Sequence, residues 1–435
     1  MDPARTAEVI DEDEGVTSSS DSLRAEEASS AEAEAFINKI SRAILVALVL
    51  AVGLATYVGA GIGAEQQASS ETSDARLGGD FAAFYAAGSI VLSGDIDDLY
   101  DAERQADAQT DLGLDGFLAF AYPPHVAAAY APLAALDFTV AYAVHTAVMA
   151  GAVVLALWLL RDIVPLIGRW KWPLLAASLT FYPLATAVGG GQNTALSILG
   201  MAVVWRALHE DREWLAGSAA GLMMFRPQYG IPVVGLMLLA RHWEAVVAAV
   251  GTVATTWLAT AFVRGTSWLS DWWAQVVPFV EQDAEVNASN SISILGFLQA
   301  AWSADSRPAV ILGALGAAIV VAALMFLWLN PSRFTLANRM GATAIGVLLI
   351  SPHTMFYDAG LLVIAGAALM ATATRVPARM LAAVWFVSLV HLWSSAFGAT
   401  PLALVVVASF VAMTIYATST SHTTASTSRT LEGVS

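Results

Sequence analysis

The sequence contains no cysteine and is poor in basic residues. Its 435 residues include 20 Lys and Arg against 36 Asp and Glu, which gives a formal net charge of −16. Without cysteine, the chain can form neither a disulfide framework nor a thiolate metal site. Because no basic face is available to neutralise phosphates, we expect no nucleic acid among its partners.

Charged residues of both signs are scarce. They make up 13% of the chain, whereas hydrophobic residues make up 57%, and this composition does not fit a surface that faces water. Apolar runs recur between Ile40 and Ala417, and the longer ones match the roughly 20 helical residues that cross a bilayer core. The sequence therefore predicts an all-α integral membrane protein embedded in a lipid bilayer.

About twelve membrane segments are expected from these runs. They lie at 40–62, 138–160, 173–188, 193–208, 215–226, 229–240, 244–263, 309–329, 338–351, 357–373, 379–396 and 400–417. Twelve basic residues fall at the entrance of the first segment and in the connections after even-numbered segments, against five in the opposite connections. Because basic residues remain on the cytoplasmic side, both termini are predicted to be cytoplasmic.

The chain is expected to divide into one membrane domain and two tails. Residues 1–37 are acidic and poor in large apolar side chains, and 418–435 are rich in Ser and Thr. Such segments bury too little apolar surface to offset the entropy of ordering, so both are predicted to be disordered. The membrane domain, 38–417, contains two large extracytoplasmic loops, 63–137 and 264–308.

Asp80 directly precedes an apolar segment, 81–92, whose composition suits a helix lying at the headgroup boundary. A carboxylate there can face a cavity, where partial desolvation would raise its proton affinity and allow it to act as a general base. The alternative is that Asp80 caps the helix, a role for which Asp is well suited. Spacing alone leaves both interpretations open.

Arg226 lies between two apolar runs, 215–226 and 229–240, that are too short to cross a membrane and are better explained as a helical hairpin. Pro227 disfavours helical geometry at Arg226, so the chain is expected to break there. An arginine in the membrane centre costs roughly 2.5–3.5 kcal/mol, so an anion should pair with it. A phosphate matches the guanidinium fork, and an internal salt bridge or snorkelling is the alternative.

Three further polar stretches lie on the same predicted side of the membrane. Gln192 and Asn193 follow three glycines, and amides at a helix start can bind sugar hydroxyls or phosphate, although a tight structural turn is the alternative. Tyr122 precedes a double proline that fixes an extended entry into the next segment. His353 follows Pro352 and could orient a carboxylate or contact a phosphate, although lone histidines are usually structural.

Five short motifs join these residues into one ordered pattern. They are Gly79-Asp80-Phe81 with Tyr85, Tyr122-Pro123-Pro124, Gly191-Gln192-Asn193, Arg226-Pro227-Gln228 and Ser351-Pro352-His353. The pattern resembles the polyprenol-phosphate-mannose-dependent α-mannosyltransferase family of bacterial membrane enzymes, within the GT-C superfamily, over residues 38–417. One departure is Arg226, where we expect this family often to have lysine; the charge is kept.

The resemblance implies a GT-C type multi-helix bundle that transfers a hexose, mannose being expected, from a polyprenyl-phosphate donor to a glycolipid or glycan acceptor. Transfer would occur on the extracytoplasmic face of a bacterial plasma membrane. By this resemblance, Asp80 is the general base for direct, inverting attack, Arg226 holds the donor phosphate and His353 assists catalysis. The substrate-binding residues that it implies are Tyr85, Tyr122, Gln192, Asn193, Gln228, Tyr357 and Asp358.

No cofactor and no metal are expected, because no Asp-x-Asp pair lies at the proposed site to hold a divalent ion. A secondary transporter or lipid-linked sugar translocase is the main alternative, since broken helices with a buried charge are typical of transporters. The first outer loop of about 75 residues and the lack of an evident internal repeat favour the enzyme. A non-catalytic membrane scaffold would leave Asp80, Arg226 and His353 without a common purpose.

Overall fold

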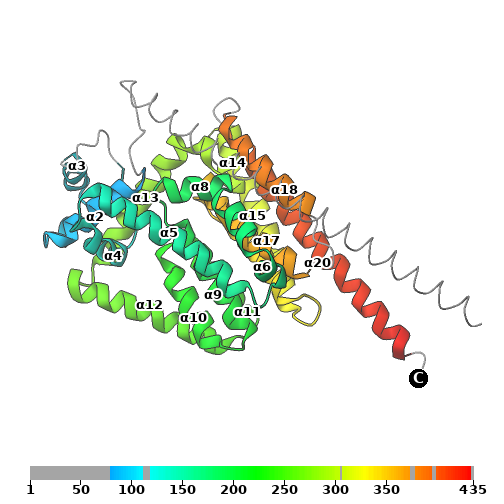
Figure 1. Ribbon diagram of the computed structural model, residues 1–435. Coiled ribbons are helices and arrows are strands. Elements are labelled where there is room, and N and C mark those ends of the chain that lie inside the picture. Colours follow the sequence, from blue (N-terminus) through cyan, green and yellow to red (C-terminus); the bar gives the residue numbers. More distant parts are fainter. Residues whose placement is uncertain (1–78, 111–117, 304–305, 373–377, 394–397, 433–435) are drawn as a thin grey trace, which may run out of the picture. The chain divides into compact units, whose positions relative to one another are not determined.

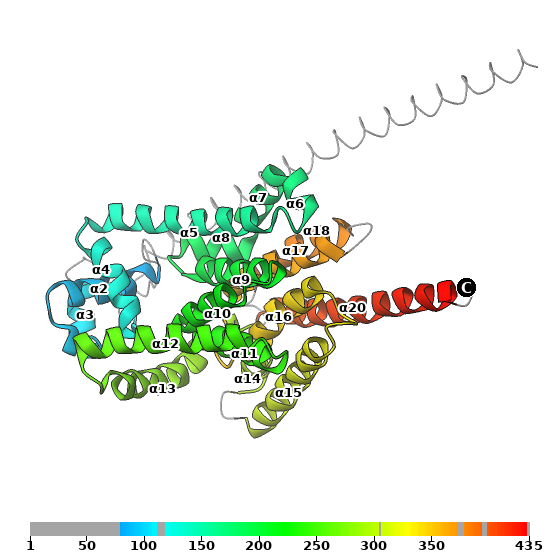
Figure 2. The ribbon, with the colours of Figure 1, turned by 90° about the horizontal axis from the view of Figure 1, so that it is seen from below.

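The computed structural model describes residues 79–110, 118–303, 306–372, 378–393 and 398–432, which all belong to one compact unit, Gly53–Ser435. The expected tail 1–37, the first expected membrane segment and the loop residues before 79 lie outside the described residues. Helices form nearly all the regular structure in this part of the chain (Figures 1 and 2). Its one β-contact is an isolated antiparallel bridge between Ser291 and Met355.

The helices follow one another with short connections. In chain order they are α2 (Phe81–Leu92), α3 (Ala102–Thr110), α4 (Pro124–Ala134), α5 (Phe138–Leu160), α6 (Pro165–Arg169), α7 (Lys171–Leu179), α8 (Tyr182–Gly189), α9 (Thr194–His209), α10 (Glu213–Leu222), α11 (Pro227–Leu239), α12 (Trp243–Arg264), α13 (Trp268–Val286), α14 (Ile294–Ala301), α15 (Arg307–Leu329), α16 (Leu336–Ile350), α17 (Leu362–Thr372), α18 (Ala378–Val387) and α20 (Leu402–Glu432). Short 3-10 helices are η1 (Ile96–Asp98), η2 (Met223–Phe225), η3 (Ala288–Asn290), η4 (Phe356–Leu361) and η5 (Ser388–Trp393).

Three described helices, α5, α12 and α15, are long and apolar enough to cross a membrane. The consecutive helices α8 and α9 are bent by 119° at their junction and together would make a fourth span. The expectation of twelve spans is therefore not confirmed, because most of the other apolar runs form shorter helices. Proline explains one of these breaks: the expected segment 173–188 divides into α7 and α8, and Pro183 lies in the first turn of α8, where its fixed φ is tolerated.

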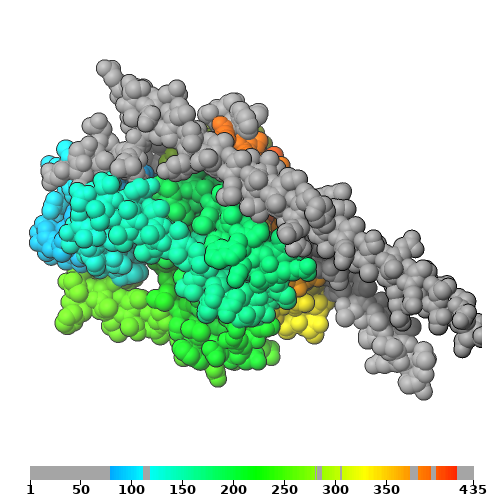
Figure 3. Space-filling model, viewed as in Figure 1, coloured from blue at the N-terminus to red at the C-terminus, as the bar shows by residue number. Residues whose placement is uncertain are grey.

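The long helices have outward-facing apolar side chains. On α5, Ala141, Met149 and Val153 are buried, whereas Val140 and Val148 are exposed, and this helix runs along the face seen in Figure 3. Exposed apolar residues also occur along α12 and α15. A surface of this kind suits contact with lipid rather than with water.

Helix α16 is the centre of the bundle. Every residue from Ala337 to Leu349 is buried, and the helix packs against α9, α15, α17 and α20. A Cβ added at Gly341 would lie 2.6 Å from the Cβ of Ala368 on α17, so the small residue permits close helix packing. The end of α16 at Ile350 therefore leads into a turn, 351–355, in which Ser351, Thr354 and Met355 are buried.

Helix α10 packs closely on α12 through small residues. Gly217 and Gly221 face Ala245 and Ala249, and a Cβ added at Gly217 would lie 1.9 Å from the carbonyl oxygen of Ala245. Small residues spaced four apart on both helices let two backbones approach in this way. The packing holds the α10–α11 hairpin, which the sequence predicted, against the rest of the bundle.

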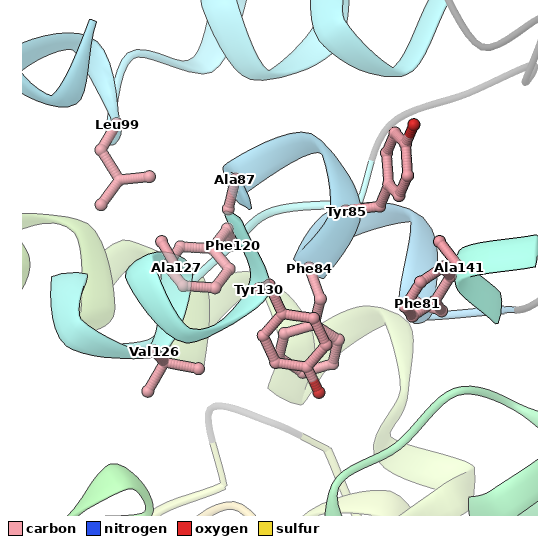
Figure 4. Close-up of a cluster of buried hydrophobic side chains, with 10 residues drawn as sticks. All are labelled: Phe81, Phe84, Tyr85, Ala87, Leu99, Phe120, Val126, Ala127, Tyr130 and Ala141. Carbon is pink, nitrogen blue, oxygen red and sulfur yellow. The ribbon is translucent and has the colours of Figure 1, made fainter. Parts of the chain in front are cut away.

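Helix α2 forms over 81–92 as predicted, and it packs against α3 and α4. Its aromatic side chains belong to a buried cluster with residues from α4, α5 and the segment before α4, and Figure 4 shows the rings of Phe84 and Tyr130 stacked with centroids 4.7 Å apart. The hydrophobicity that suggested a helix at the headgroup boundary is therefore explained by burial within the protein.

The C-terminal segment differs from its prediction. Residues 418–435 were expected to be disordered, but α20 continues to Glu432. The sequence from Leu402 to Glu432 contains neither glycine nor proline, so nothing in it breaks the helix. The Thr418 hydroxyl donates to the carbonyl of Thr414, which satisfies this polar side chain within the helix.

Candidate active site

Arg226 lies at a break between two helices, as its sequence context predicted. The 3-10 helix η2 ends at Phe225, α11 begins at Pro227, and Arg226 has non-helical angles of φ −123° and ψ 84°. Proline at the first helical position is favourable because its missing N–H has no partner there in any case. The break places a guanidinium that is only 4% exposed inside the bundle.

The Arg226 guanidinium joins three distant segments. Its Nη1 pairs with the Asp358 carboxylate, and its Nη2 donates to Gln192 Oε1 at 3.0 Å and to the Tyr122 hydroxyl at 3.2 Å. The internal salt bridge, one of the alternatives left open by the sequence, is therefore present. Asp358, predicted to bind substrate, is the counter-ion of Arg226.

Asp358 is 3% exposed and lies in the first turn of η4. Its Oδ1 also accepts a hydrogen bond of 2.8 Å from the Thr194 hydroxyl, and its Oδ2 accepts one of 3.2 Å from the Met355 N–H. A buried carboxylate needs such partners to offset its loss of hydration. Sequence reasoning missed Thr194, whose one available signal was its position directly after Gln192 and Asn193.

Two glycine turns bring Asp80 to the same place. The Asp80 N–H donates to the Gly190 carbonyl at 3.0 Å, and Gly79 has φ +50°. A Cβ at Gly79 would lie 2.7 Å from the Gly190 oxygen, so this contact requires glycine. Asp80 occupies the N-cap position of α2, but its side chain makes no capping hydrogen bond; the capping interpretation is therefore wrong.

The turn that follows α8 has the geometry of a Schellman motif. Gly191 adopts φ +73°, and the Gln192 N–H donates to the Ala187 carbonyl at 2.8 Å. The Tyr142 hydroxyl of α5, which sequence reasoning did not single out, donates to the Gly189 carbonyl at 2.5 Å. These bonds fix the direction of the chain where α8 gives way to α9, and so they position Gln192.

Tyr122 is held from both sides. Its carbonyl accepts a hydrogen bond from Tyr100 at 2.8 Å, and the neighbouring Ala121 carbonyl accepts one from the Trp272 indole at 3.0 Å. Burial raises the pKa of the Tyr122 phenol; the nearby Arg226 lowers this pKa, whereas Asp358 and Asp80 raise it. Tyr122 therefore lies within electrostatic reach of both the predicted base and the ion pair.

His353 lies in the turn between α16 and η4, five residues before Asp358. Its ring packs edge-on against the ring of Phe279 on α13, with the two ring centroids 5.6 Å apart. A 2.9 Å hydrogen bond from the Ile292 N–H to the Thr354 carbonyl joins the turn to the segment before α14. These contacts place His353 beside α13. Its predicted cooperation with Asp80 or a phosphate stays a prediction.

The remaining predicted substrate residues differ in their surroundings. Tyr85 is buried and its hydroxyl donates to the Leu136 carbonyl at 2.7 Å, which anchors α2 to the turn before α5. Tyr357 is half-buried. Its phenol lies close enough to Asp80, Asp358 and Arg226 to interact with their charges. Gln228 is half-buried in the first turn of α11. Their roles toward a substrate stay predictions.

Asn193 is the N-cap residue of α9 and is 1% exposed, yet its side chain makes no capping bond and its Oδ1 has no partner.

The described residues contain no group of three or more His, Asp or Glu side chains that could hold a metal ion. The site therefore consists of one buried ion pair, one further carboxylate and several amide and hydroxyl groups, gathered where α8, α9, α11 and η4 meet.

Residues 120–352 match the family model described as glycosyltransferase family 87. The match covers more than half of the chain and includes Tyr122, Gln192, Asn193 and Arg226. No curated protein and no solved structure matches the chain. A helical protein with apolar spans and this match is a membrane glycosyltransferase. Specifically, the chain belongs to glycosyltransferase family 87.

Proposed function

We propose that this glycosyltransferase moves a hexose, with mannose the expected sugar, from a polyprenyl-phosphate donor to a glycolipid or glycan acceptor. The reaction would take place on the extracytoplasmic face of a bacterial plasma membrane, with both termini in the cytoplasm. Membership of the family supports the transfer of a sugar. The order of the five sequence motifs supports the lipid-linked donor.

The observation that carries this proposal is that the predicted base and the predicted phosphate ligand contact one turn. The Asp80 N–H donates to the Gly190 carbonyl, and the Arg226 guanidinium donates to the Gln192 side chain, both at 3.0 Å. Two segments that lie far apart in the sequence therefore meet within the three residues Gly190–Gln192. A base and a leaving-group ligand must be this close to act on one glycosidic bond.

In the proposed reaction, the Asp80 carboxylate takes the proton of an acceptor hydroxyl while that oxygen forms a bond to the anomeric carbon. The bond between the anomeric carbon and the phosphate oxygen breaks, and its electron pair goes to that oxygen. Polyprenyl phosphate leaves as a monoester with one more negative charge. A single displacement of this kind inverts the anomeric configuration and uses no cofactor.

Arg226 keeps donors for a ligand in spite of its ion pair. A guanidinium has five N–H groups; three are used by Asp358, Gln192 and Tyr122, and Nε makes no hydrogen bond. The fixed partners hold the guanidinium in one orientation before substrate arrives. Preorganised donors of this kind stabilise charge that develops on a leaving group, and His353 would assist from the adjoining turn.

The proposal is tested with the purified full chain in lipid vesicles, supplied with polyprenyl-phosphate mannose and a mixture of membrane glycolipids as acceptors. Formation of mannosylated product together with release of polyprenyl phosphate is expected. Asp80→Asn should lower turnover by about 10²-fold or more, whereas Asp98→Asn, an exposed carboxylate of the same loop, should not. Full turnover by Asp80→Asn would remove Asp80 from the mechanism, and absence of transfer from any polyprenyl-phosphate hexose would refute the donor.

A further inference from the structure

The start of α9 is buried and uncapped. Asparagine is among the best N-cap residues because its side-chain oxygen accepts from the first backbone N–H groups, but the side chain of Asn193 does not do so. In the described part of the chain, the N–H groups of Asn193, Thr194 and Ala195 have no acceptor, whereas the Leu196 N–H donates to the Asn193 carbonyl at 3.0 Å. Buried donors without partners are unfavourable, so an acceptor supplied by a ligand would stabilise them.

Arg226 reaches the same helix end. It donates to Gln192, the residue before the N-cap, and shares the Asp358 Oδ1 atom with the Thr194 hydroxyl. Its Nε is buried and has no hydrogen-bond partner. Two sets of unmet donors, the helix amides and the guanidinium, therefore lie together, although Asp358 is already engaged by the Thr194 side chain, Arg226 and the Met355 N–H.

The dipole of α9 favours an anion at its first turn. The N-terminus of a helix carries a partial positive charge, so a cation beside it is unfavourable unless a negative group lies between them. Helix α9 is 16 residues long and begins at the 119° break with α8. In some membrane transporters, broken helices direct their N-termini toward anionic groups of the substrate.

We infer that the N-terminus of α9, flanked by Asn193 and by Nε of Arg226, is the subsite that takes the phosphate group of the lipid-linked donor and of the polyprenyl-phosphate product. This inference rests on the proposed function and deepens it. The backbone N–H groups of Asn193, Thr194 and Ala195 donate to phosphate oxygens. The Asn193 Oδ1 accepts from a neighbouring hydroxyl, which the sugar supplies.

This placement gives the leaving group its own electrostatic support. When the glycosidic bond breaks, negative charge grows on the phosphate oxygen, and a helix N-terminus that points at this oxygen stabilises the charge without reorganising. The Gly190 carbonyl, three residues before Asn193, accepts the Asp80 N–H. The base and the leaving group are thus held by neighbouring positions of one turn.

The first experiment uses the purified full chain in detergent and a short-chain prenyl monophosphate, with the matching prenol and inorganic phosphate as separate probes. Asn193→Asp keeps a residue type that is favoured at the N-cap position but adds a carboxylate that can accept from the free amides and that repels an anion. The Kd for prenyl monophosphate should rise by about tenfold or more, and prenol binding should not change. Ser306→Asp adds the same charge at the N-cap of α15 and should leave the binding of prenyl monophosphate and of prenol unchanged.

An unchanged Kd for prenyl monophosphate in Asn193→Asp overturns the inference. If Asn193→Asp weakens the binding of both prenyl monophosphate and inorganic phosphate, the subsite recognises the phosphate group itself. If only the binding of prenyl monophosphate is weakened, the subsite recognises the lipid-linked phosphate. Because Asn193→Asp could fail to fold, hydrogen exchange of the wild-type chain is the second measurement. Saturating prenyl monophosphate should slow exchange of the amides at 193–195 relative to prenol, and unchanged exchange contradicts the subsite.

The proposed function and this inference can fail separately. If the wild-type chain transfers no hexose from any polyprenyl phosphate but Asn193→Asp loses phosphate affinity, the donor is wrong and the anion subsite stands. If transfer occurs and Asn193→Asp keeps both its donor KM and its Kd, the function stands and the subsite is wrong.

Discussion

The hydroxyl of Thr194 and the carboxylate of Asp358 are joined by a 2.8 Å hydrogen bond that links the start of α9 to η4, although the two residues lie 164 positions apart. The same Asp358 oxygen pairs with Arg226. Thr194 therefore sets the position of the carboxylate that orients the guanidinium. It acts on the site through Asp358, and we describe it as a positioning residue.

Thr194→Val is expected to reduce activity by loosening Arg226. The change keeps the shape of the side chain but removes a hydrogen bond to a charged group, a bond worth about 1.5–3 kcal/mol. Donor KM should rise several-fold with a smaller change in kcat, and Thr194→Ser should recover most of the loss. The control is Thr186→Val, because the Thr186 hydroxyl bonds only to carbonyls of its own helix α8. Equal kinetics for Thr194→Val and Thr186→Val would contradict the positioning role.

Variants of the buried Arg226–Asp358 ion pair test its contributions to stability and to activity separately. Asp358→Ala leaves the Arg226 guanidinium buried without its counter-ion, which is expected to cost about 3–5 kcal/mol in the free energy of unfolding. Arg226→Met combined with Asp358→Leu removes both charges and should regain much of that stability, as followed by thermal unfolding in detergent. The double variant should remain inactive because it lacks the guanidinium. Activity in the double variant would show that Arg226 does not act on the donor.

Arg226→Ala tests the guanidinium itself. The donor KM should rise because the group that would contact the phosphate is absent. This rise in KM should be larger than the rise caused by Arg264→Ala. Arg264 makes a second partly buried ion pair, with Asp97, at the end of α12. The two variants lose comparable charge at different places. A donor KM that responds equally to both changes would place the phosphate away from Arg226.

The sequence predicted the long helices well because their patterns are local. The expected segment 138–160 coincides with α5, which begins after Asp137, whose side chain accepts from the Thr139 N–H as an N-cap. The apolar run 81–92 coincides with α2. Both helices have an uninterrupted sequence and a clear start. The number of membrane spans was not predictable in the same way, since packing decides whether two helices separated by a bend act as one span.

The candidate site was predicted only in part. A break at Arg226 and the need for an anion both follow from Pro227 and from the cost of a buried charge. Asp358 could not be chosen as that anion from the sequence, because it lies 132 residues away and no local pattern connects the two residues. The Thr194 hydroxyl was equally hidden, since a threonine in the first turn of an apolar helix is common and carries no signal of its own.

Gly79→Ala should damage the active site through its backbone. Alanine at φ +50° is strained, and its Cβ would also meet the Gly190 carbonyl at 2.7 Å, so the hydrogen bond from Asp80 to Gly190 is expected to break. Gly94→Ala is the matched control, because Gly94 has φ +90° but no atom within 4 Å of the added Cβ. Both variants should lose some stability, whereas turnover should fall by at least about tenfold, equal to about 1.4 kcal/mol, only for Gly79→Ala. Similar turnover in the two variants would mean that the contact between the glycine turns does not position Asp80.

Gly217→Ala should separate two helices without touching the site directly. The added Cβ would overlap the Ala245 carbonyl, at 1.9 Å, so α10 must move away from α12, and overpacking of this kind costs about 1–3 kcal/mol. Gly251→Ala on α12, where no atom lies within 4 Å of the new Cβ, should instead be neutral or stabilise the helix by up to about 1 kcal/mol. Thermal unfolding in detergent gives both values. Because α10 leads through η2 to Arg226, Gly217→Ala should also raise the donor KM, and an unchanged KM at reduced stability would show that the hairpin can shift without moving the guanidinium.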